Sequence, residues 1–166
     1  MSALLTSRCE CGKVRCTATG TPIVSAVCYC TDCQAGGHII EALPGAPHVL
    51  DPDGGTAYLT WRDDRFAVIA GEELLVPYTL KEGAPTRRMV ASCCNSGMFV
   101  KFGPGHWTST YRLRFAGELP PIEMRTKVAQ RQSDLPMPDD APVYRGFGAK
   151  LFWRLIASRV AMLVGR

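Results

Sequence analysis

Hydrophobic and polar residues alternate, or gather in short β-rich runs, along most of the chain, as is typical of strands with at least one buried face. These runs are residues 14–18, 23–28, 38–41, 56–60, 66–70, 74–79, 88–92 and 98–102. Turns rich in Gly, Pro and Asp separate them, for example at 43–47 and 51–55. The pattern predicts a mainly β protein of short strands.

The end of the chain differs, because residues 146–166 follow a helical period. Arg154 and Ser158 form a narrow polar stripe, and apolar residues occupy most of the remaining circumference. Such a helix must be covered by something. We expect it to dock on its own β domain or on a second subunit. The alternative is a helix lying in the plane of a membrane, which Trp153 and the arginines would suit.

The chain of 166 residues is long enough for one hydrophobic core. We predict a β domain over residues 1–116, a Pro-rich connecting segment over 117–145 with a short helix at 124–133, and a basic amphipathic helix over 146–166. Up to Pro120 the acidic and basic residues balance, so this part gives no electrostatic reason to bind nucleic acid. From Pro121 onward there are 8 Lys and Arg against 4 Asp and Glu, so the C-terminal part carries the whole net charge of +4.

The N-terminus lacks the apolar core of a signal peptide, and the apolar run at 151–164 is too short to span a bilayer. We therefore expect a cytoplasmic protein, in which thiols stay reduced. In that compartment the 8 cysteines favour metal binding over a disulfide framework.

Cys28, Cys30 and Cys33 form the most informative cluster. Thiols at positions i and i+2 of an extended segment share a face, and a third thiol after a turn at Thr31–Asp32 can curl back toward them. This spacing predicts a metal site. The alternative is a redox-active set of thiols.

Cys9 and Cys11 form a second same-face pair, which needs ligands from elsewhere to close a site. Cys93 and Cys94 are the remaining candidates, provided that the backbone turns near Asn95, because neighbouring residues of a strand point to opposite faces. A four-thiolate site, a three-cysteine site with Cys94 turned away, and loss of this metal all stay open. Cys16 has no neighbouring partner and is expected to be a buried core residue.

Taken together, these motifs resemble the GFA family, which comprises glutathione-dependent formaldehyde-activating enzymes and centromere protein V. The resemblance covers about residues 7–102 and rests on Cys9-x-Cys11-Gly12-x-Val14-Arg15, Cys28-Tyr29-Cys30-x-x-Cys33-Gln34, Gly71-Glu72-x-Leu74-x-x-x-Tyr78, and Arg88 ahead of Cys93. It implies a β-tent fold of small antiparallel sheets around one or two zinc ions. It also implies that Cys28, Cys30 and Cys33 hold a catalytic zinc, while Cys9 and Cys11 join a later CxxCG pair around a structural one.

The later pair departs from the family pattern. Cys93-Cys94-Asn95-Ser96-Gly97 fits CxxCG only if Ser96 replaces the second cysteine, so that Cys94 is either an extra thiol or a shifted ligand. The departure indicates a divergent subgroup of the family.

Three thiolates on zinc leave one position open, as in catalytic sites, and a soft thiol substrate suits such an ion. The expected function is a carbon–sulfur lyase acting on an aldehyde adduct of a small thiol; glutathione and formaldehyde follow from the resemblance alone. Candidates for binding substrate carboxylates are Arg62, Arg65, Arg87 and Arg88, and His38 is a candidate fourth ligand or acid/base, although each has an ordinary structural explanation. A non-catalytic zinc module that binds a protein partner and a thiol redox sensor remain alternatives.

Overall fold

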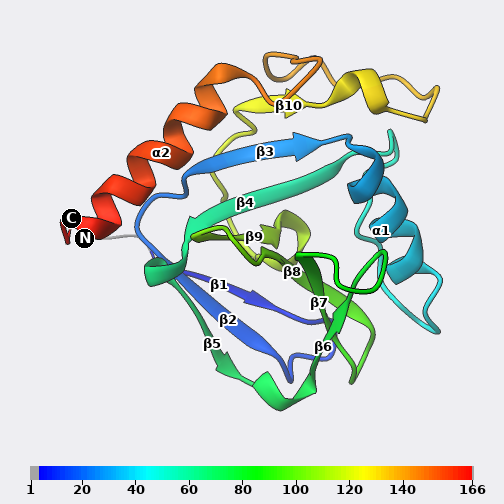
Figure 1. Ribbon diagram of the computed structural model, residues 1–166. Helices are drawn as coiled ribbons and strands as arrows, with labels where there is room; N and C mark the ends of the chain where they lie inside the picture. Colours follow the sequence, from blue (N-terminus) through cyan, green and yellow to red (C-terminus); the bar gives the residue numbers. More distant parts are fainter. Residues whose placement is uncertain (1–3, 166) are drawn as a thin grey trace.

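Two β-sheets and two helices make up the fold in this computed structural model, which describes residues 4–165 (Figure 1). The smaller sheet has three antiparallel strands in the order β1 (Leu4–Arg8), β2 (Arg15–Thr19) and β5 (Phe66–Ala70). Strand β2 therefore lies in the middle, and the turn between β1 and β2 carries Cys9 and Cys11 at one end of this sheet.

The larger sheet has seven strands, and all its neighbours are antiparallel except β10 and β3. Its order is β10 (Met124–Thr126), β3 (Val24–Cys28), β4 (Thr56–Arg62), β9 (Trp107–Tyr111), β8 (Ser96–Phe102), β7 (Thr86–Ala91) and β6 (Leu75–Tyr78). Short 3-10 helices follow β4, β5, β9 and β10, at Asp63–Arg65, Glu72–Leu74, Arg112–Arg114 and Val128–Gln130. The mainly β fold with antiparallel sheets and a C-terminal helix is thus confirmed.

Apolar side chains from both sheets meet in a common core. Val14 and Cys16 from the β1–β2 part of the chain pack with Ala91 and Met98 of the larger sheet, and all four are fully buried. Cys16 is therefore a core residue, as predicted. Because the same cluster includes Cys9, one metal-ligand candidate lies directly at the contact between the sheets.

Helix α1 (Thr31–Glu41) covers one end of the larger sheet, and α2 (Ala149–Leu163) runs along the other side of the molecule (Figure 1). Ile40 of α1 packs with Val49, Tyr58 and Tyr111. The strand predicted at 38–41 is therefore wrong. The reason is that residues 33, 36, 37 and 40 follow the helical period and face the sheet, a pattern hidden by two glycines that are poor helix formers.

The helix predicted at 124–133 is also wrong. Met124–Thr126 forms β10 and extends the larger sheet by pairing with β3, and only Val128–Gln130 makes a single helical turn. The other predicted strands coincide with observed ones to within about two residues at each end. The division of the chain at 116 and 145 stays a prediction, and residues 1–3 and 166 lie outside the described part.

Gly71 joins the two sheets at a tight contact and allows a direct test of the fold. Its φ of +71° is matched by Gly83, but a Cβ at Gly71 would lie 2.6 Å from the Lys13 carbonyl oxygen, whereas one at Gly83 meets nothing within 4 Å. We expect Gly83→Ala to lower the free energy of unfolding by about 1 kcal/mol. Gly71→Ala should lower the free energy of unfolding by about 1–3 kcal/mol more than Gly83→Ala does, because the backbone at Lys13 must move to make room for the Cβ. Urea unfolding of both variants checks this, and equal losses would contradict the close contact.

Within residues 4–165, no helix has both the length and the apolar content required to traverse a bilayer.

Candidate metal centres

The predicted cysteine ligands gather into two separate clusters. Within each cluster the sulfur atoms all lie within 4.8 Å of one another. We call Cys28, Cys30 and Cys33 the triplet site, and Cys9, Cys11, Cys93 and Cys94 the four-cysteine site. All of these thiols are free rather than disulfide-bonded.

The sulfur spacing of the four-cysteine site suits a tetrahedral metal ion. The Sγ–Sγ distances are 3.6 Å for Cys9–Cys11, 3.9 Å for Cys9–Cys93, 3.3 Å for Cys11–Cys93 and 3.9 Å for Cys93–Cys94. Four sulfurs at the usual Zn–S distance would be roughly 3.8 Å apart. The set is thus close to the size that zinc requires, and sulfur ligands of this kind select zinc over the harder cations.

A tight turn allows both neighbouring cysteines to reach the same point. Residues 92–95 turn between β7 and β8, and Asn95 adopts a left-handed conformation with φ of 53°. The buried Ser96 then begins β8, with its Oγ 3.1 Å from Cys94 Sγ and accepting a hydrogen bond from the Glu10 backbone N–H. Ser96 thus supports the cluster through its hydroxyl group, and Cys94 supplies the fourth sulfur.

The four-cysteine site connects the two sheets. Cys9 and Cys11 belong to the β1–β2 turn of the smaller sheet, and Cys93 and Cys94 belong to the β7–β8 turn of the larger one. A metal held here would therefore cross-link two hairpins that lie more than 80 residues apart in sequence. This location is that of a structural metal.

The triplet site is built where β3 ends and α1 begins. Cys28 is the last residue of β3, Cys30 is the N-cap of α1, and Cys33 lies in the first helical turn. The Cys30 sulfur accepts a hydrogen bond from the Cys33 backbone N–H at 3.3 Å, in the manner of a capping side chain. The CxCxxC spacing thus corresponds to the end of a strand followed by the N-terminus of a helix.

The electrostatics of the triplet favour one thiolate before any metal binds. Hydrogen bonds from Cys28 and Cys33, with help from backbone N–H groups of the helix N-terminus, lower the pKa of Cys30 well below its usual value. The same hydrogen bonds raise the pKa of Cys28 and of the buried Cys33. A helix N-terminus that stabilises a thiolate prepares the cluster to take a cation.

Two further side chains, which the sequence did not mark as part of a metal site, lie at the triplet: one contacts Cys33, and the other contacts the neighbouring Asp32. The buried Tyr58 hydroxyl lies 3.8 Å from Cys33 Sγ and donates a hydrogen bond to it, and burial raises the pKa of Tyr58, so that it remains a donor. Arg88, only 3% exposed, donates from Nη2 to the Asp32 carbonyl at 2.6 Å. Such outer contacts orient metal ligands and adjust the charge of the site.

Close packing against α1 holds Arg88 in place. A Cβ at Gly36 would lie 1.9 Å from Arg88 Nε, so the helix must have glycine there to admit the guanidinium group. Arg88 Nε itself has no hydrogen-bond partner among the described atoms. A buried guanidinium group at the first turn of α1, where Cys30 and Cys33 lie, would offset negative charge on a metal–thiolate cluster.

The other predicted arginines lie elsewhere. Arg87 is exposed on β7, and its side chain points to the opposite face of the sheet from that of Arg88. Arg62 pairs with Asp64 at the far end of β4, roughly 20 Å along the strand from Thr56, the partner of Cys28. Arg65 follows in the 3-10 turn after β4. Of the four arginines, Arg88 is the one that the structure brings to α1 and the triplet.

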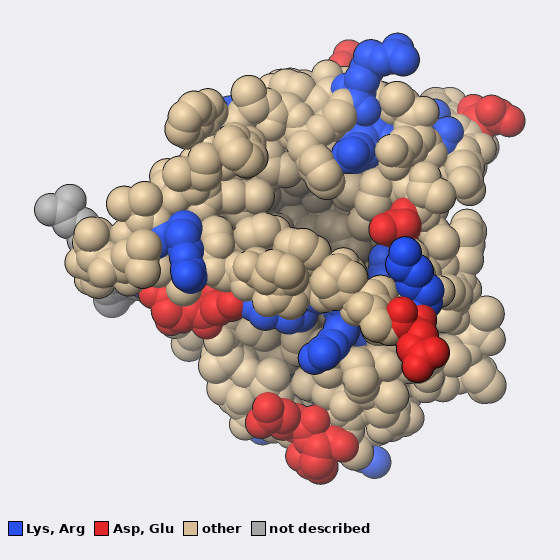
Figure 2. Space-filling view, viewed as in Figure 1, with Lys and Arg blue, Asp and Glu red and all other residues tan. Residues whose placement is uncertain are grey.

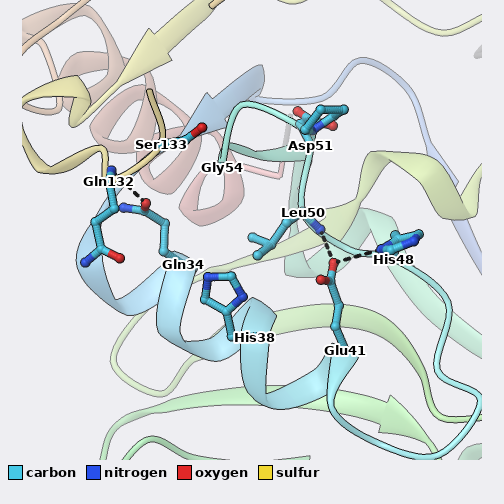
Figure 3. A pocket seen from close by; sticks show the side chains of 10 residues that line it. Gln34, His38, Glu41, His48, Leu50, Asp51, Gly54, Gln132 and Ser133 are labelled. Carbon is cyan, nitrogen blue, oxygen red and sulfur yellow. Dashed lines mark hydrogen bonds and ion pairs between the residues drawn. The ribbon is translucent and has the colours of Figure 1, made fainter. Parts of the chain in front are cut away.

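A cavity beside α1 is a different feature from the triplet site (Figure 3). It has a volume of about 600 Å³, and among the described residues no cysteine lines it. His38 points into it, while Glu41 accepts a hydrogen bond from the Leu50 backbone N–H at 2.9 Å and lies 3.6 Å from His48 Nδ1 (Figure 3). His38 is thus exposed on another face of α1 than Cys33 and does not join the triplet.

Replacing Arg88 tests its contribution to the triplet. Arg88→Met retains the apolar stem but removes the charge, so we expect metal affinity at the triplet to fall by about 10- to 100-fold. Competition with a chromophoric zinc chelator measures this affinity. Arg87→Met, the neighbouring charge on the opposite face, is the control and should leave it unchanged; equal effects of the two variants would show that Arg88 acts only through net charge.

Two comparisons with known proteins give a match, and a third gives none. No curated protein matches the sequence. Among solved structures, the chain is similar to a Rhodobacter sphaeroides protein with a TM-score of 0.48 and 15% sequence identity, over 69% of this chain and 91% of that one. The family model described as glutathione-dependent formaldehyde-activating enzyme (GFA) matches residues 4–41. This match confirms the resemblance to the GFA family over the segment that contains Cys9, Cys11 and the whole triplet site.

Proposed function

We propose that this protein is a zinc-dependent carbon–sulfur lyase-type enzyme that makes or breaks the adduct between a small thiol, such as glutathione, and an aldehyde. One observation carries the proposal. Within residues 4–165, the triplet site gathers three cysteine sulfurs, and no fourth Cys, His, Asp or Glu donor joins them. A site with three protein ligands leaves room for a substrate, whereas a structural site is closed by four.

The donor set determines which substrate fits. Zinc bound there would supply a Lewis acid that favours the thiolate form of an incoming thiol. Cys28, Cys30 and Cys33 hold the reaction centre at the N-terminus of α1, while Arg88 and Tyr58 provide positive charge and a hydrogen bond to this sulfur-rich group. Both features favour an additional anionic sulfur, which is why a thiol is the preferred substrate class.

The reaction balances without any further reactant. The substrate sulfur forms a bond to the aldehyde carbon, the carbonyl electron pair moves to oxygen, and the thiol proton ends on that oxygen. The reverse direction breaks the same carbon–sulfur bond. The protein therefore needs to orient two molecules and to move one proton, and neither step requires an oxidant or a reductant.

Space for the substrate lies next to the triplet. Ala26 and Cys28, two residues apart, lie on the same face of β3. Tyr58 pairs with Ala26, so Tyr58 and Thr60 continue this face on β4. Between α2 and α1 the molecule is hollowed over β3 and β4 (Figure 2). Thr60 and Ser109 place hydroxyl groups 3.0 Å apart on the same face of the sheet.

The rate of thiol–aldehyde exchange tests the proposal. Two-dimensional NMR exchange spectroscopy on glutathione and formaldehyde should show faster formation of the hydroxymethyl adduct when the zinc-loaded protein is added. Cysteine and other small thiols, in place of glutathione, would define the substrate class. An exchange rate that stays at the uncatalysed value for every thiol, with zinc bound to the triplet, would refute the proposed activity and favour a non-catalytic zinc module.

A further inference from the structure

Two polar residues of helix α2, Arg154 and Ser158, contact the rest of the protein. Arg154 pairs with Glu123 at 2.5 Å and donates to the Ile23 carbonyl at 3.3 Å. One turn later, the buried Ser158 lies 2.8 Å from His106 Nε2. An ordinary surface helix turns its apolar face toward the core and its polar face toward solvent. In α2 the two polar residues predicted to form a stripe face inward instead.

The apolar side of α2 consequently faces solvent. We call its exposed apolar residues the outer stripe: Phe152, Trp153, Ile156, Val160, Leu163 and Val164. At 100° per residue these side chains occupy one sector of about 120°. Trp153 is 65% exposed and Leu163 is 73% exposed, so the stripe is open along the whole helix. A continuous exposed apolar surface of this kind marks an interaction site.

Positive charge borders the outer stripe on both sides. Lys150 and Arg159 lie just beyond its two edges on the helical wheel, and α2 contains no acidic residue. In Figure 2 the surface over α2, along the upper left edge, shows no acidic side chain. Just before the helix, Lys127 Nζ stands 4.4 Å from the ring of the exposed Phe147. The surface thus combines apolar residues with basic ones only.

An apolar groove extends the outer stripe onto the body of the protein. It has a volume of about 360 Å³ and lies between α2 and the start of β9, lined by both Trp107 and Phe152. Ile156 and Val160 form its helical wall, and Arg159 and His106 stand beside it. The stripe and groove together could accommodate acyl chains next to a positively charged group.

We propose that α2 docks this protein in the plane of an anionic lipid surface. The outer stripe would enter the boundary between head groups and acyl chains, while Lys150 and Arg159 remain at the level of the phosphates. Trp153 and Phe152 are aromatic residues of the kind that gather at this boundary. The helix is too short to cross the bilayer, so it lies on the surface. This role is independent of the metal sites.

Charge argues against a second copy of the chain as the occupant. In a two-fold dimer the same surface meets itself, so the basic borders of two outer stripes would face one another. Without an acidic residue on α2 to pair with them, the contact would juxtapose like charges, which is unfavourable at an interface. An anionic membrane supplies the opposite charge for both borders at once.

Vesicle flotation of the full-length, zinc-loaded protein tests the proposal. We expect binding to phosphatidylcholine vesicles that contain phosphatidylglycerol, weaker binding at high salt, and little binding to phosphatidylcholine alone. Lys150→Gln with Arg159→Gln should weaken binding to the anionic vesicles by about 30-fold. Val160→Glu should weaken it by at least about tenfold, since the valine can no longer be buried.

The matched control for Val160→Glu is Ile69→Glu on β5, because Ile69 is also 53% exposed but lies on the smaller sheet, away from α2. It should bind vesicles like the unaltered protein. Tryptophan emission should shift to shorter wavelength on binding, and Trp153→Phe should reduce the shift, with the remainder coming from Trp107 in the groove. Failure to bind any vesicle, equal binding by the two glutamate variants, or a dimer in sedimentation that Val160→Glu dissociates would each overturn the proposal.

Discussion

Replacing Cys30 by serine should abolish adduct formation and remove one zinc ion per chain while leaving the protein folded. Cys30 belongs to the triplet site and is hydrogen-bonded to both of the other thiols. Without it, two sulfurs remain, too few for a stable catalytic site. Serine is itself a preferred N-cap residue, so α1 should keep its first turn. The exchange rate should therefore fall to the uncatalysed value without a change in circular dichroism.

Cys16→Ser is the appropriate comparison for Cys30→Ser. It makes the same chemical change at a cysteine that belongs to neither cluster. Its only effect should be a lower free energy of unfolding, because Cys16 lies in the core. Zinc content and activity should therefore survive in Cys16→Ser. Full activity of Cys30→Ser would remove the triplet from the mechanism.

Replacing Cys11 by serine should instead destabilise the whole protein. The four-cysteine site joins the β1–β2 hairpin to the β7–β8 turn, so loss of a metal held there would remove a cross-link between the two sheets. Binding energy at a structural zinc site is folding energy. We expect a loss of several kcal/mol out of a total stability of about 5–15 kcal/mol, seen as a lower urea midpoint and partial unfolding at room temperature.

The exposure of Cys11 makes this test clean. Because its side chain is exposed, the substitution creates no cavity in the core, and any large loss of stability must come from the metal site. A chelator should destabilise the unaltered protein by at least as much as Cys11→Ser does. If Cys11→Ser and Cys30→Ser had the same effect on stability, the division into a structural and a catalytic site would be wrong.

Much of the strand pattern could be predicted from the sequence because alternation has a direct physical cause. Strands such as β4 and β8 carry apolar side chains on faces that are buried against a core. The three shortest or weakest signals were missed: β1 is polar and lies at an edge, β9 is mostly Ser, Thr and aromatic, and β10 has only three residues. Their strand conformation depends on neighbours that the sequence alone does not place.

Helix α1 could not be predicted because its composition follows its contacts. Gly36 admits Arg88, and at Gly37 a Cβ would lie 2.4 Å from Leu50 Cδ2, so the helix accepts two poor helix formers in order to pack closely. The same contacts bring Arg88 and Tyr58 to the triplet. The cysteine spacing therefore predicted which sulfurs could meet, whereas the groups that surround them depend on packing across distant parts of the chain.

The orientation of α2 also depends on contacts with distant residues, which the sequence alone does not reveal. The helical period predicted a helix with a narrow polar stripe and a large apolar surface, and both are present. We expected the apolar surface to be covered by the protein or a second subunit. The inward position of Ser158 and Arg154 depends on His106 and Glu123, which lie far from α2 in sequence.

Titration of glutathione into cobalt-substituted protein tests the central claim most directly. Cobalt absorption reports on the sulfur ligands of the metal, so a thiol entering the open position of the triplet changes the spectrum. We predict a saturable increase in the sulfur-to-cobalt charge-transfer band that is absent in Cys30→Ser and retained in Cys16→Ser. A spectrum that stays constant as glutathione is raised would mean that the triplet offers no place for a thiol, and would contradict the account.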